Sequence, residues 1–402
     1  MKRILSNREI VLGVTGSIAA YKACDLASRF VEYGALVTPV LTQSACELVG
    51  PATFEAICGR RAITRMFEPL QNPEVEHIAV ALRAHLYVIA PATANFIAKA
   101  AHGLADDWLT TTLLATRAPI LIAPAMNSNM YDHPATQENM QTLKRRGVHF
   151  VGPDAGRLAC RTVGSGRLIE PMKILEASLP LVSERRDLRG VRIVITSGGT
   201  HEPIDPVRYI GNRSSGKMGR ALAIEALARG ADVTVITGPC DTPLPEGALV
   251  IPVESAAYMA ETVVNLAQDA DVFIGAAAVS DYRVENPADS KRKKSGKTMD
   301  LVLVENPDVI GLVSAVKKRG QILVGFAAET DDLIANAQTK LKKKHLDLIV
   351  ANEVNTSESG FGKDTSRATL ISGSGDVETL PLLTKDEVAE RILDRVVALR
   401  GR

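Results

Sequence analysis

The sequence lacks a net charge of either sign. Its 47 Lys and Arg residues are balanced by 46 Asp and Glu residues, which leaves a formal charge of +1 at pH 7. A strongly basic chain would favour a nucleic acid or an anionic membrane surface as partner, and the balance here predicts neither. Anions must therefore be bound at local sites.

Long apolar runs are also missing, so no segment is expected to span a bilayer. The charged residues 1–9 do not resemble a secretory signal. Cysteine is scarce, and no two cysteines form a CxxC pair; the five are Cys24, Cys46, Cys58, Cys160 and Cys240. Such scattered, odd-numbered cysteines argue against a disulfide framework or a structural zinc site. We therefore expect a cytoplasmic protein.

The length of 402 residues is too great for one ordinary core and predicts two domains. A hydrophobic content of 46% with 23% charged residues excludes a disordered or fibrous class. Residues 171–190 contain a charge cluster and no clear strand, and we interpret them as the connection between the halves. The predicted domains are residues 1–190, including this linker, and 191–402.

Short β-branched runs alternate with amphipathic helical stretches in both halves. The first half is expected to contain strands at 9–14, 35–41, 85–90 and 119–123, with helices at 18–33, 95–101 and 108–115. The second is expected to contain strands at 191–196, 232–237, 271–275, 322–326 and 347–351. This alternation predicts an α/β protein with two tandem Rossmann-like domains, whose ligands bind beyond the carboxyl ends of the strands.

A glycine-bearing turn follows the first strand, Gly-Val-Thr-Gly-Ser-Ile at 13–18, and opens a helix. Glycine permits a close backbone approach, and a helix N-terminus offers N–H groups to a phosphate. The spacing is not the GxGxxG of dinucleotide-binding folds, which disfavours an NAD(P) oxidoreductase. By itself the turn is equally compatible with a plain strand-to-helix connection, as is the polar turn at 42–45.

Two further segments and one histidine distinguish the first half. They are Ala-Pro-Ala-Thr-Ala-Asn at 90–95, Pro-Ala-Met-Asn at 124–127, and His77 upstream of both. With the first turn, they resemble the flavin-containing cysteine decarboxylase family, and in particular its phosphopantothenoylcysteine decarboxylases. The resemblance implies a flavodoxin-like fold and FMN as cofactor. It implies FMN contacts from Gly16, Ser17, Ile18, Thr42, Ser44, Thr93, Ala94, Asn95 and Ala125.

The same resemblance assigns the reaction to His77, Asn127 and Cys160. A cysteine-derived carboxylate has no electron sink for decarboxylation unless flavin oxidation first produces a thioaldehyde. His77 would steer deprotonation, and Asn127 would bind the carboxylate without adding a charge that opposes loss of CO₂. Cys160 lies in a Gly-rich stretch, 152–168, which is interpreted as a flap, and would deliver the final proton.

Each of these residues also has a simpler interpretation: a helix-start histidine, a helix cap, and a packed small side chain. Their joint occurrence favours the catalytic one. It also disfavours a non-catalytic flavin-binding regulator, which needs none of the three. The chain departs from the family at His85, where an acidic residue is usual, and at Trp108, where a smaller apolar residue is usual. Both departures concern local packing.

The second half contains another glycine turn, Thr-Ser-Gly-Gly-Thr at 196–200, and a polar loop, Asn-Arg-Ser-Ser-Gly-Lys-Met-Gly at 212–219, that opens a helix at 217–228. The latter is not a Walker A loop. Ala-Ala-Ala-Val-Ser-Asp-Tyr at 276–282 follows a strand, and a basic cluster follows at 291–297. Alone, that cluster is typical of a solvated loop; beside a nucleotide-type fold it would neutralise a triphosphate.

Together with Gly-Phe-Ala-Ala-Glu-Thr at 325–330, these motifs resemble phosphopantothenate–cysteine ligases of the bacterial bifunctional type. The resemblance implies CTP as co-substrate, with 4′-phosphopantothenate and cysteine. The implied CTP contacts are Ala277, Asp281, Lys291, Pro307, Asp308, Val309, Ile310, Phe326, Lys340 and Lys344.

The implied reaction begins with attack of the phosphopantothenate carboxylate on the α-phosphate of CTP, and the cysteine amine then displaces CMP. Mg²⁺ would bridge the phosphates with Asp281 as its protein ligand. Lys291 would stabilise the α-phosphoryl charge, while Asn212 and Arg208 would place the acyl intermediate. The resemblance also implies a homo-oligomer built from trimers of the flavin domain and dimers of the ligase domain.

Overall fold

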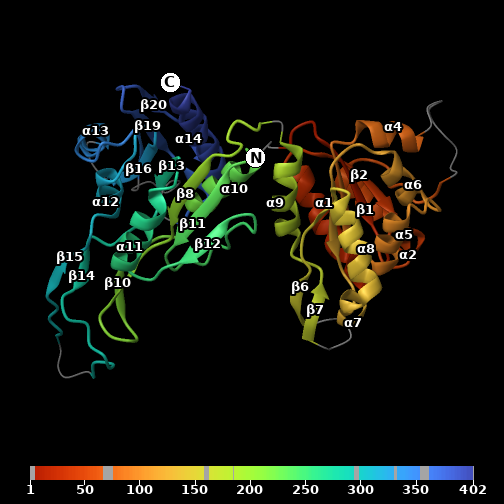
Figure 1. The fold of residues 1–402 in the computed structure, drawn as a ribbon, viewed down its shortest axis with the longest axis horizontal. Coiled ribbons are helices and arrows are strands. Elements are labelled where there is room, and N and C mark those ends of the chain that lie inside the picture. The colour runs from red at the N-terminus through yellow and green to blue at the C-terminus, as the bar shows by residue number, and fades with distance from the viewer. Residues whose placement is uncertain are drawn as a thin grey trace. The chain divides into compact units, whose positions relative to one another are not determined.

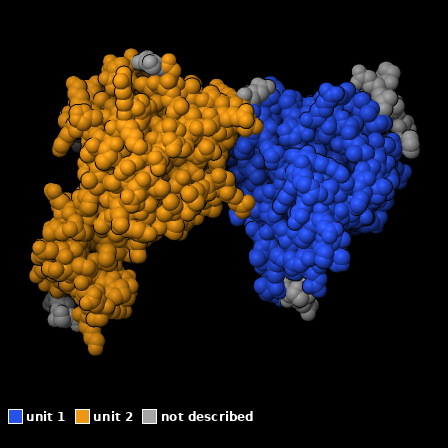
Figure 2. All heavy atoms as spheres, viewed as in Figure 1, with its two compact units in different colours: residues 1–183 blue, residues 184–402 orange. Residues whose placement is uncertain are grey.

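The structure, a computed structural model, describes residues 5–66, 76–157, 163–183, 185–293, 298–329, 333–353 and 362–401. The chain forms two compact units, Met1–Ser183 and Glu184–Arg402, coloured separately in Figure 2. None of the helices among the described residues is long and apolar enough to cross a membrane. The four described cysteines are free thiols.

Unit 1 is built on a five-stranded parallel sheet with the order β2-β1-β3-β4-β5. Its strands are β1 (Glu9–Val14), β2 (Leu36–Leu41), β3 (Leu86–Ala92), β4 (Ile120–Pro124) and β5 (His149–Phe150). All seven residues of β3 are buried, because helices cover both faces of a parallel sheet. The order is that of flavodoxin-like folds, which confirms the predicted fold class.

The remaining elements of unit 1 connect these strands or follow the last one (Figure 1). They are η1 (Ile18–Tyr21), α1 (Lys22–Glu32), α2 (Gln43–Cys46), α3 (Pro51–Cys58), α4 (Glu76–Arg83), α5 (Ala94–His102), α6 (Trp108–Ala115), α7 (Ser128–Asp132), α8 (Pro134–Arg145), β6 (Asp154–Arg157), β7 (Val163–Arg167) and α9 (Pro171–Val182).

Helix α9 corrects the interpretation of residues 171–190 as only a connection. Its residues Ile174, Leu175, Leu179 and Val182 are buried at helical spacing, and the helix packs on α1 and β3 inside unit 1. The two departures from the family pattern are local: Trp108 is buried in the unit 1 core, and His85 Nδ1 accepts a hydrogen bond from the Glu9 amide at 3.1 Å.

Unit 2 contains an eight-stranded sheet with the order β12-β11-β8-β13-β16-β17-β19-β20. The strands are β8 (Arg192–Ser197), β11 (Asp232–Thr237), β12 (Leu249–Pro252), β13 (Val272–Gly275), β16 (Ile322–Glu329), β17 (Leu348–Glu353), β19 (Ala368–Ser372) and β20 (Val377–Thr379). The first six in this order are parallel, and β19 and β20 are antiparallel additions. In chain order the parallel strands run 3-2-1-4-5-6, the Rossmann arrangement.

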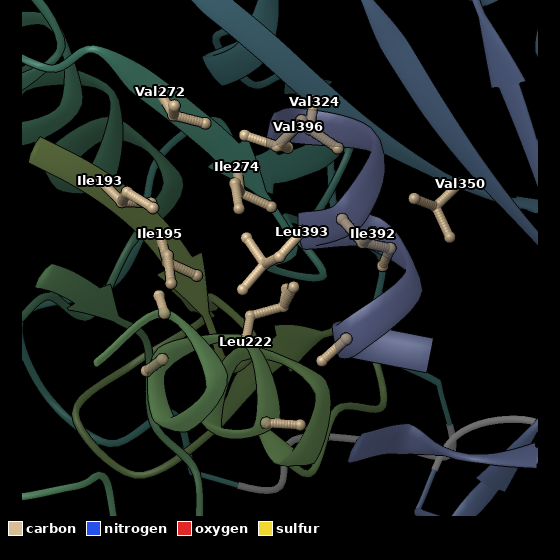
Figure 3. Packing of buried hydrophobic residues seen from close by; sticks show 14 of the residues in the cluster. Ile193, Ile195, Leu222, Val272, Ile274, Val324, Val350, Ile392, Leu393 and Val396 are labelled. Atoms are coloured by element: carbon tan, nitrogen blue, oxygen red, sulfur yellow. The ribbon is translucent and has the colours of Figure 1, made fainter. Parts of the chain in front are cut away.

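Two cores lie on the two faces of this sheet. On one face, α10 (Lys217–Ala228) and α14 (Lys385–Arg400) pack on the sheet, and Leu222 and Leu393 meet around Ile195 and Ile274 (Figure 3). On the other face are α11 (Ala256–Ala267), α12 (Val309–Ala315) and α13 (Leu333–Lys343). Residues of β8 alternate between the two clusters, as the two-residue period of a strand requires.

Short hairpins project beyond the carboxyl end of the unit 2 sheet (Figure 1). They pair β9 (His201–Pro203) with β10 (Tyr209–Gly211) and β14 (Tyr282–Val284) with β15 (Leu303–Glu305), and β14 contacts β9. A further pair joins β18 (Thr365–Ser366) to β21 (Leu383–Thr384). The sequence did not predict these hairpins, since strands of two or three residues are too short for a recognisable alternation.

Candidate active sites

The first candidate site lies where the strand order of unit 1 reverses, between β1 and β3. Loops that follow β1, β3 and β4 line a cavity of about 660 Å³ together with the β6–β7 hairpin. Thr15 joins two of these loops, because its buried Oγ1 donates to the Pro91 carbonyl at 2.7 Å and accepts from the Thr93 amide at 3.0 Å. The cavity therefore has the position and size expected of a cofactor site.

The predicted FMN contacts divide into two groups. Gly16, Ser17, Ile18, Thr93 and Ala125 line the cavity, whereas Thr42, Ser44, Ala94 and Asn95 do not. Ser44 nevertheless supports the first loop, since a Cβ added to Gly16 would lie 2.4 Å from the Ser44 Cβ. Thr42 and Thr93 cap α2 and α5 by accepting from Ala45 and Phe96 amides.

The three predicted catalytic residues of this unit have different placements. Asn127 lines the cavity and caps α7, with its Oδ1 accepting from the Asn129 amide at 2.9 Å. His77 is the second residue of α4 and lies outside the lining of this cavity. Cys160 lies outside the described residues.

Three basic side chains without a predicted role, Lys22, Arg157 and Arg167, line the same cavity. Lys22 and Arg167 both donate to Glu170, at 2.9 and 2.7 Å. The hydrogen bond from Lys22, assisted by Arg167, lowers the pKa of the Glu170 carboxyl. Lys22 begins α1 four residues after the glycine turn, and that position was a usable signal, but nothing local marks Arg157. Three cations around a cavity of this size fit an anionic cofactor such as a flavin phosphate.

The second candidate site lies beyond the carboxyl ends of β8, β13 and β16 in unit 2. It consists of two adjoining cavities of about 590 and 320 Å³ that share Ala277, Val279, Asp281, Phe326 and Lys340. We refer to them as the larger and the smaller cavity. Because they share one wall, a single extended ligand or two reacting ligands can occupy both.

The larger cavity gathers most of the predicted CTP contacts. Besides the shared residues, Pro307, Asp308, Val309, Ile310 and Lys344 line it; Lys291 lines neither cavity. Lys344 Nζ donates to Asp308 Oδ1 at 2.9 Å, and Lys340 Nζ donates to the Phe326 carbonyl at 2.8 Å. Burial raises the pKa of Asp308, but the hydrogen bonds from Lys344 and the Gly311 amide, together with the charges of Lys344 and Lys340, outweigh it, and the pKa is lowered.

Asn306 was not among the residues predicted from the sequence. Its Nδ2 donates to the Ser280 carbonyl at 2.9 Å, and its Oδ1 is buried without a hydrogen-bond partner among the described residues. Asn306 belongs to the wall of the larger cavity. An unsatisfied acceptor beside two lysines fits a ligand that carries both N–H donors and phosphates, as a nucleotide does.

The smaller cavity contains Asn212, whose Nδ2 donates to the Val279 carbonyl at 2.8 Å. It also contains Lys217 and Lys385, two lysines to which the sequence analysis gave no role. Lys217 Nζ donates to Asp364 Oδ1 at 2.6 Å. Burial, and then the neighbouring Lys217, lower the pKa of Lys385. A cavity wall that contains two lysines favours an anionic substrate.

Arg208, the remaining predicted residue, lies outside the linings of both cavities. Its guanidinium donates to Asp205 Oδ2 from Nε at 3.0 Å and from Nη2 at 2.5 Å. Among the described residues, no group of three or more His, Cys, Asp or Glu side chains could hold a metal ion. Asp281 alone suits Mg²⁺ that is held mainly by substrate phosphates.

Comparisons with known proteins agree with this division of the chain. Residues 1–183 match a family model described as flavoprotein, and residues 188–399 match the DNA/pantothenate metabolism flavoprotein C-terminal domain. The chain is 46% identical to the coenzyme A biosynthesis bifunctional protein CoaBC of Bacillus subtilis over 98% of both chains. It is 40% identical to that of Escherichia coli K12, over 98% of this chain and 97% of that one.

Solved structures match the two halves separately. The C-terminal domain of a coenzyme A biosynthesis bifunctional protein CoaBC is 37% identical, with a TM-score of 0.46, over 53% of this chain and 97% of that chain. The FMN-dependent cysteine decarboxylase SpaF is 33% identical, with a TM-score of 0.37, over 44% of this chain and 99% of that chain.

The family models and the full-length relatives confirm both resemblances found in the sequence. The chain therefore belongs to the family of bifunctional coenzyme A biosynthesis proteins, in which a flavoprotein unit is followed by a DNA/pantothenate metabolism flavoprotein C-terminal domain.

Proposed function

We propose how the two activities of this bifunctional enzyme, decarboxylation and ligation, divide between its units. Unit 1 decarboxylates 4′-phosphopantothenoylcysteine to 4′-phosphopantetheine with FMN. Unit 2 makes that substrate from 4′-phosphopantothenate, cysteine and CTP. The observation that carries the proposal is the presence of two separate sites, each at the carboxyl end of its own sheet and each lined by residues that the resemblance implied.

In unit 1, the first loop and Thr93 hold the FMN, and Lys22, Arg157 and Arg167 hold phosphate groups. The bound flavin supplies the electron acceptor, and later the donor, for the thiol side of the substrate. The cap bond to Asn129 fixes the amide of Asn127, so that its Nδ2 donates to the substrate carboxylate. His77 steers deprotonation, and Cys160 returns a proton to the carbon that has lost CO₂.

In unit 2, CTP occupies the larger cavity, with Lys340 and Lys344 facing its phosphates and Asp281 binding Mg²⁺. Phosphopantothenate occupies the smaller cavity. Its carboxylate oxygen attacks the α-phosphorus, the bond to the β-phosphate oxygen breaks, and pyrophosphate leaves. The cysteine amine then attacks the acyl carbon of the acyl-cytidylate, and CMP leaves with the bonding electrons. Lys291 stabilises the first transition state, and Asn212 orients the acyl group.

We further propose a cytoplasmic homo-oligomer, with trimers of flavin units and dimers of ligase units. Its support is that His77 and Lys291 lie outside the cavities of their own chain, so a second copy would supply them. Free thiols fit a reducing compartment. Analytical ultracentrifugation tests the assembly, and a purely monomeric active enzyme would refute it.

The decisive experiment is incubation of the purified protein with 4′-phosphopantothenate, cysteine, CTP and Mg²⁺, followed by mass analysis. We expect 4′-phosphopantetheine, CMP, pyrophosphate and CO₂. The variant His77→Asn should accumulate 4′-phosphopantothenoylcysteine, because ligation takes place in the other unit. Equal loss of both reactions in a folded His77→Asn protein would refute the division between units.

A further inference from the structure

Asp205 is a carboxylate with a fully buried side chain in the turn between β9 and β10. Its Oδ1 accepts the backbone N–H groups of Val207 and Arg208, each at 2.9 Å. The turn also closes on itself, since the Ile204 and Asp205 amides donate to the Arg208 carbonyl at 2.8 and 3.2 Å. One oxygen of Asp205 therefore serves to shape its own turn.

The second oxygen reaches a segment more than eighty residues further along the chain. Asp205 Oδ2 accepts the Arg292 amide at 3.1 Å, in addition to Nε and Nη2 of Arg208. Arg208 Nη2 also donates to the Arg292 carbonyl at 2.9 Å. Both backbone groups of Arg292 are thus held by one ion pair. The Ala288 amide donates to the Ile204 carbonyl at 3.0 Å and extends the attachment.

The residue directly before Arg292 is Lys291, whose side chain is exposed. The hydrogen bond to Asp205 is made by the N–H of the peptide bond that joins Lys291 to Arg292. Hydrogen bonds from Arg208, and from the three amides, hold the pKa of the Asp205 carboxyl well below its usual range. The carboxylate is therefore charged, and the attachment is complete, throughout the neutral pH range.

We propose that Asp205 is a positioning residue for ligation, which acts by fixing the backbone from which the Lys291 side chain extends. The proposal rests on the role of Lys291 in forming the acyl-cytidylate. It also gives Arg208 a second task beside the one that the resemblance implied, because Arg208 completes the attachment through its hydrogen bonds to Asp205 and Arg292.

Asp205 lies outside the linings of both unit 2 cavities. Its loss should therefore lower the maximal rate of acyl-cytidylate formation and leave the apparent affinity for CTP nearly unchanged. A general disturbance of the nucleotide site would alter both quantities, so this split separates positioning from damage to the CTP site.

The test variant is Asp205→Asn. The Arg292 amide and the Arg208 guanidinium donate to Oδ2 in the parent. An asparagine amide presents either its oxygen or its N–H₂ group to these donors, and it lacks the negative charge that binds Arg208. The matched control is Asp289→Asn, the same change at an exposed carboxylate of the attached segment. Rapid-quench assays without cysteine measure pyrophosphate release over a range of CTP concentrations. Trypsin digestion measures access to the backbone after Lys291, Arg292 and Lys293.

For Asp205→Asn we expect maximal pyrophosphate release to fall at least about tenfold, half-saturation by CTP to stay within about twofold, and cleavage at 291–293 to accelerate. The control should match the parent in all three. Decarboxylation of supplied 4′-phosphopantothenoylcysteine should be unchanged. If Asp205→Asn does not fold, Arg208→Lys provides the same test, since it keeps the positive charge but cannot make the paired contacts to Asp205 and Arg292.

A double-mutant cycle connects the effect to Lys291. In a Lys291→Gln background, adding Asp205→Asn should slow the residual rate no further, whereas independent effects would multiply. Parent-like cleavage, parent-like pyrophosphate release or a multiplicative cycle would each overturn the positioning role. Normal pyrophosphate release by Lys291→Gln alone would instead refute the proposed function of Lys291, and that result is distinguishable because it needs no change at Asp205.

Discussion

Gly166 offers a sharp test of the unit 1 site, because an added methyl group there meets backbone. Gly166 has φ +114°, and its carbonyl accepts the Met126 amide at 2.9 Å. An ideal Cβ at this position would lie 2.2 Å from the Met126 carbonyl oxygen. Ordinary carbon–oxygen contacts are about 3.3 Å or longer, so Gly166→Ala should push β7 from the 124–127 loop by about 1 Å.

The energetic cost follows from two terms. A non-glycine residue in this backbone region costs about 1–3 kcal/mol. Loss of the Met126–Gly166 hydrogen bond adds about 1 kcal/mol. Because Asn127 follows directly in the displaced loop, a shift of about 1 Å should lower the decarboxylation rate about 100-fold. Ligation should be unaffected, since unit 2 contains its own site.

Decarboxylation of 4′-phosphopantothenoylcysteine and ligation are measured separately on the same preparation. The matched control is Gly147→Ala in the same unit, at φ +87° with no atom within 4 Å of the added Cβ. This control has the backbone penalty without the collision, so it should lower the thermal stability and retain decarboxylation. If Gly166→Ala decarboxylates as fast as Gly147→Ala, the contact between β7 and the 124–127 loop does not shape the site.

Three further predictions concern the proposed chemistry. Cys160→Ser should release CO₂ but leave an oxidised enethiol product, and normal 4′-phosphopantetheine formation would return Cys160 to a packing role. CTP should support ligation far better than ATP, because cytosine and adenine differ in size and in donor–acceptor pattern, and a pocket whose buried polar groups match one base leaves them unpaired with the other; equal rates would refute base recognition in the larger cavity. Folding lowers the pKa of Asp308, so its ionised carboxyl stabilises the folded protein at pH values above the ordinary aspartate pKa of about 3.9. This contribution is lost as the pH falls through the lowered pKa. Lys344→Gln should therefore unfold more easily than the parent at pH 7, with a difference that shrinks below about pH 4; a constant difference down to pH 3 would contradict the pairing.

The sequence alone determined the elements that depend on local pattern. The strand at 9–14 and the helices at 108–115 and 217–228 were predicted with the bounds that the structure shows. Apolar runs of β-branched residues and glycine turns are short-range signals, and alternation of strand and helix restricts the chain to a parallel sheet. The motifs that follow these strands also supplied residues that line the candidate cavities of both units, because the carboxyl ends of parallel strands share one edge.

Only the tertiary structure decided which side chains meet. Thr93 lines the unit 1 cavity and Asn95 does not, although both follow β3 within one turn of helix. Arg157 reaches that cavity from a hairpin that no spacing rule places there. The attachment of Asp205 to Arg292 joins two loops that local spacing cannot relate. Such contacts depend on how loops fold over a completed sheet, and that arrangement is a property of the packed chain, not of any window of its sequence.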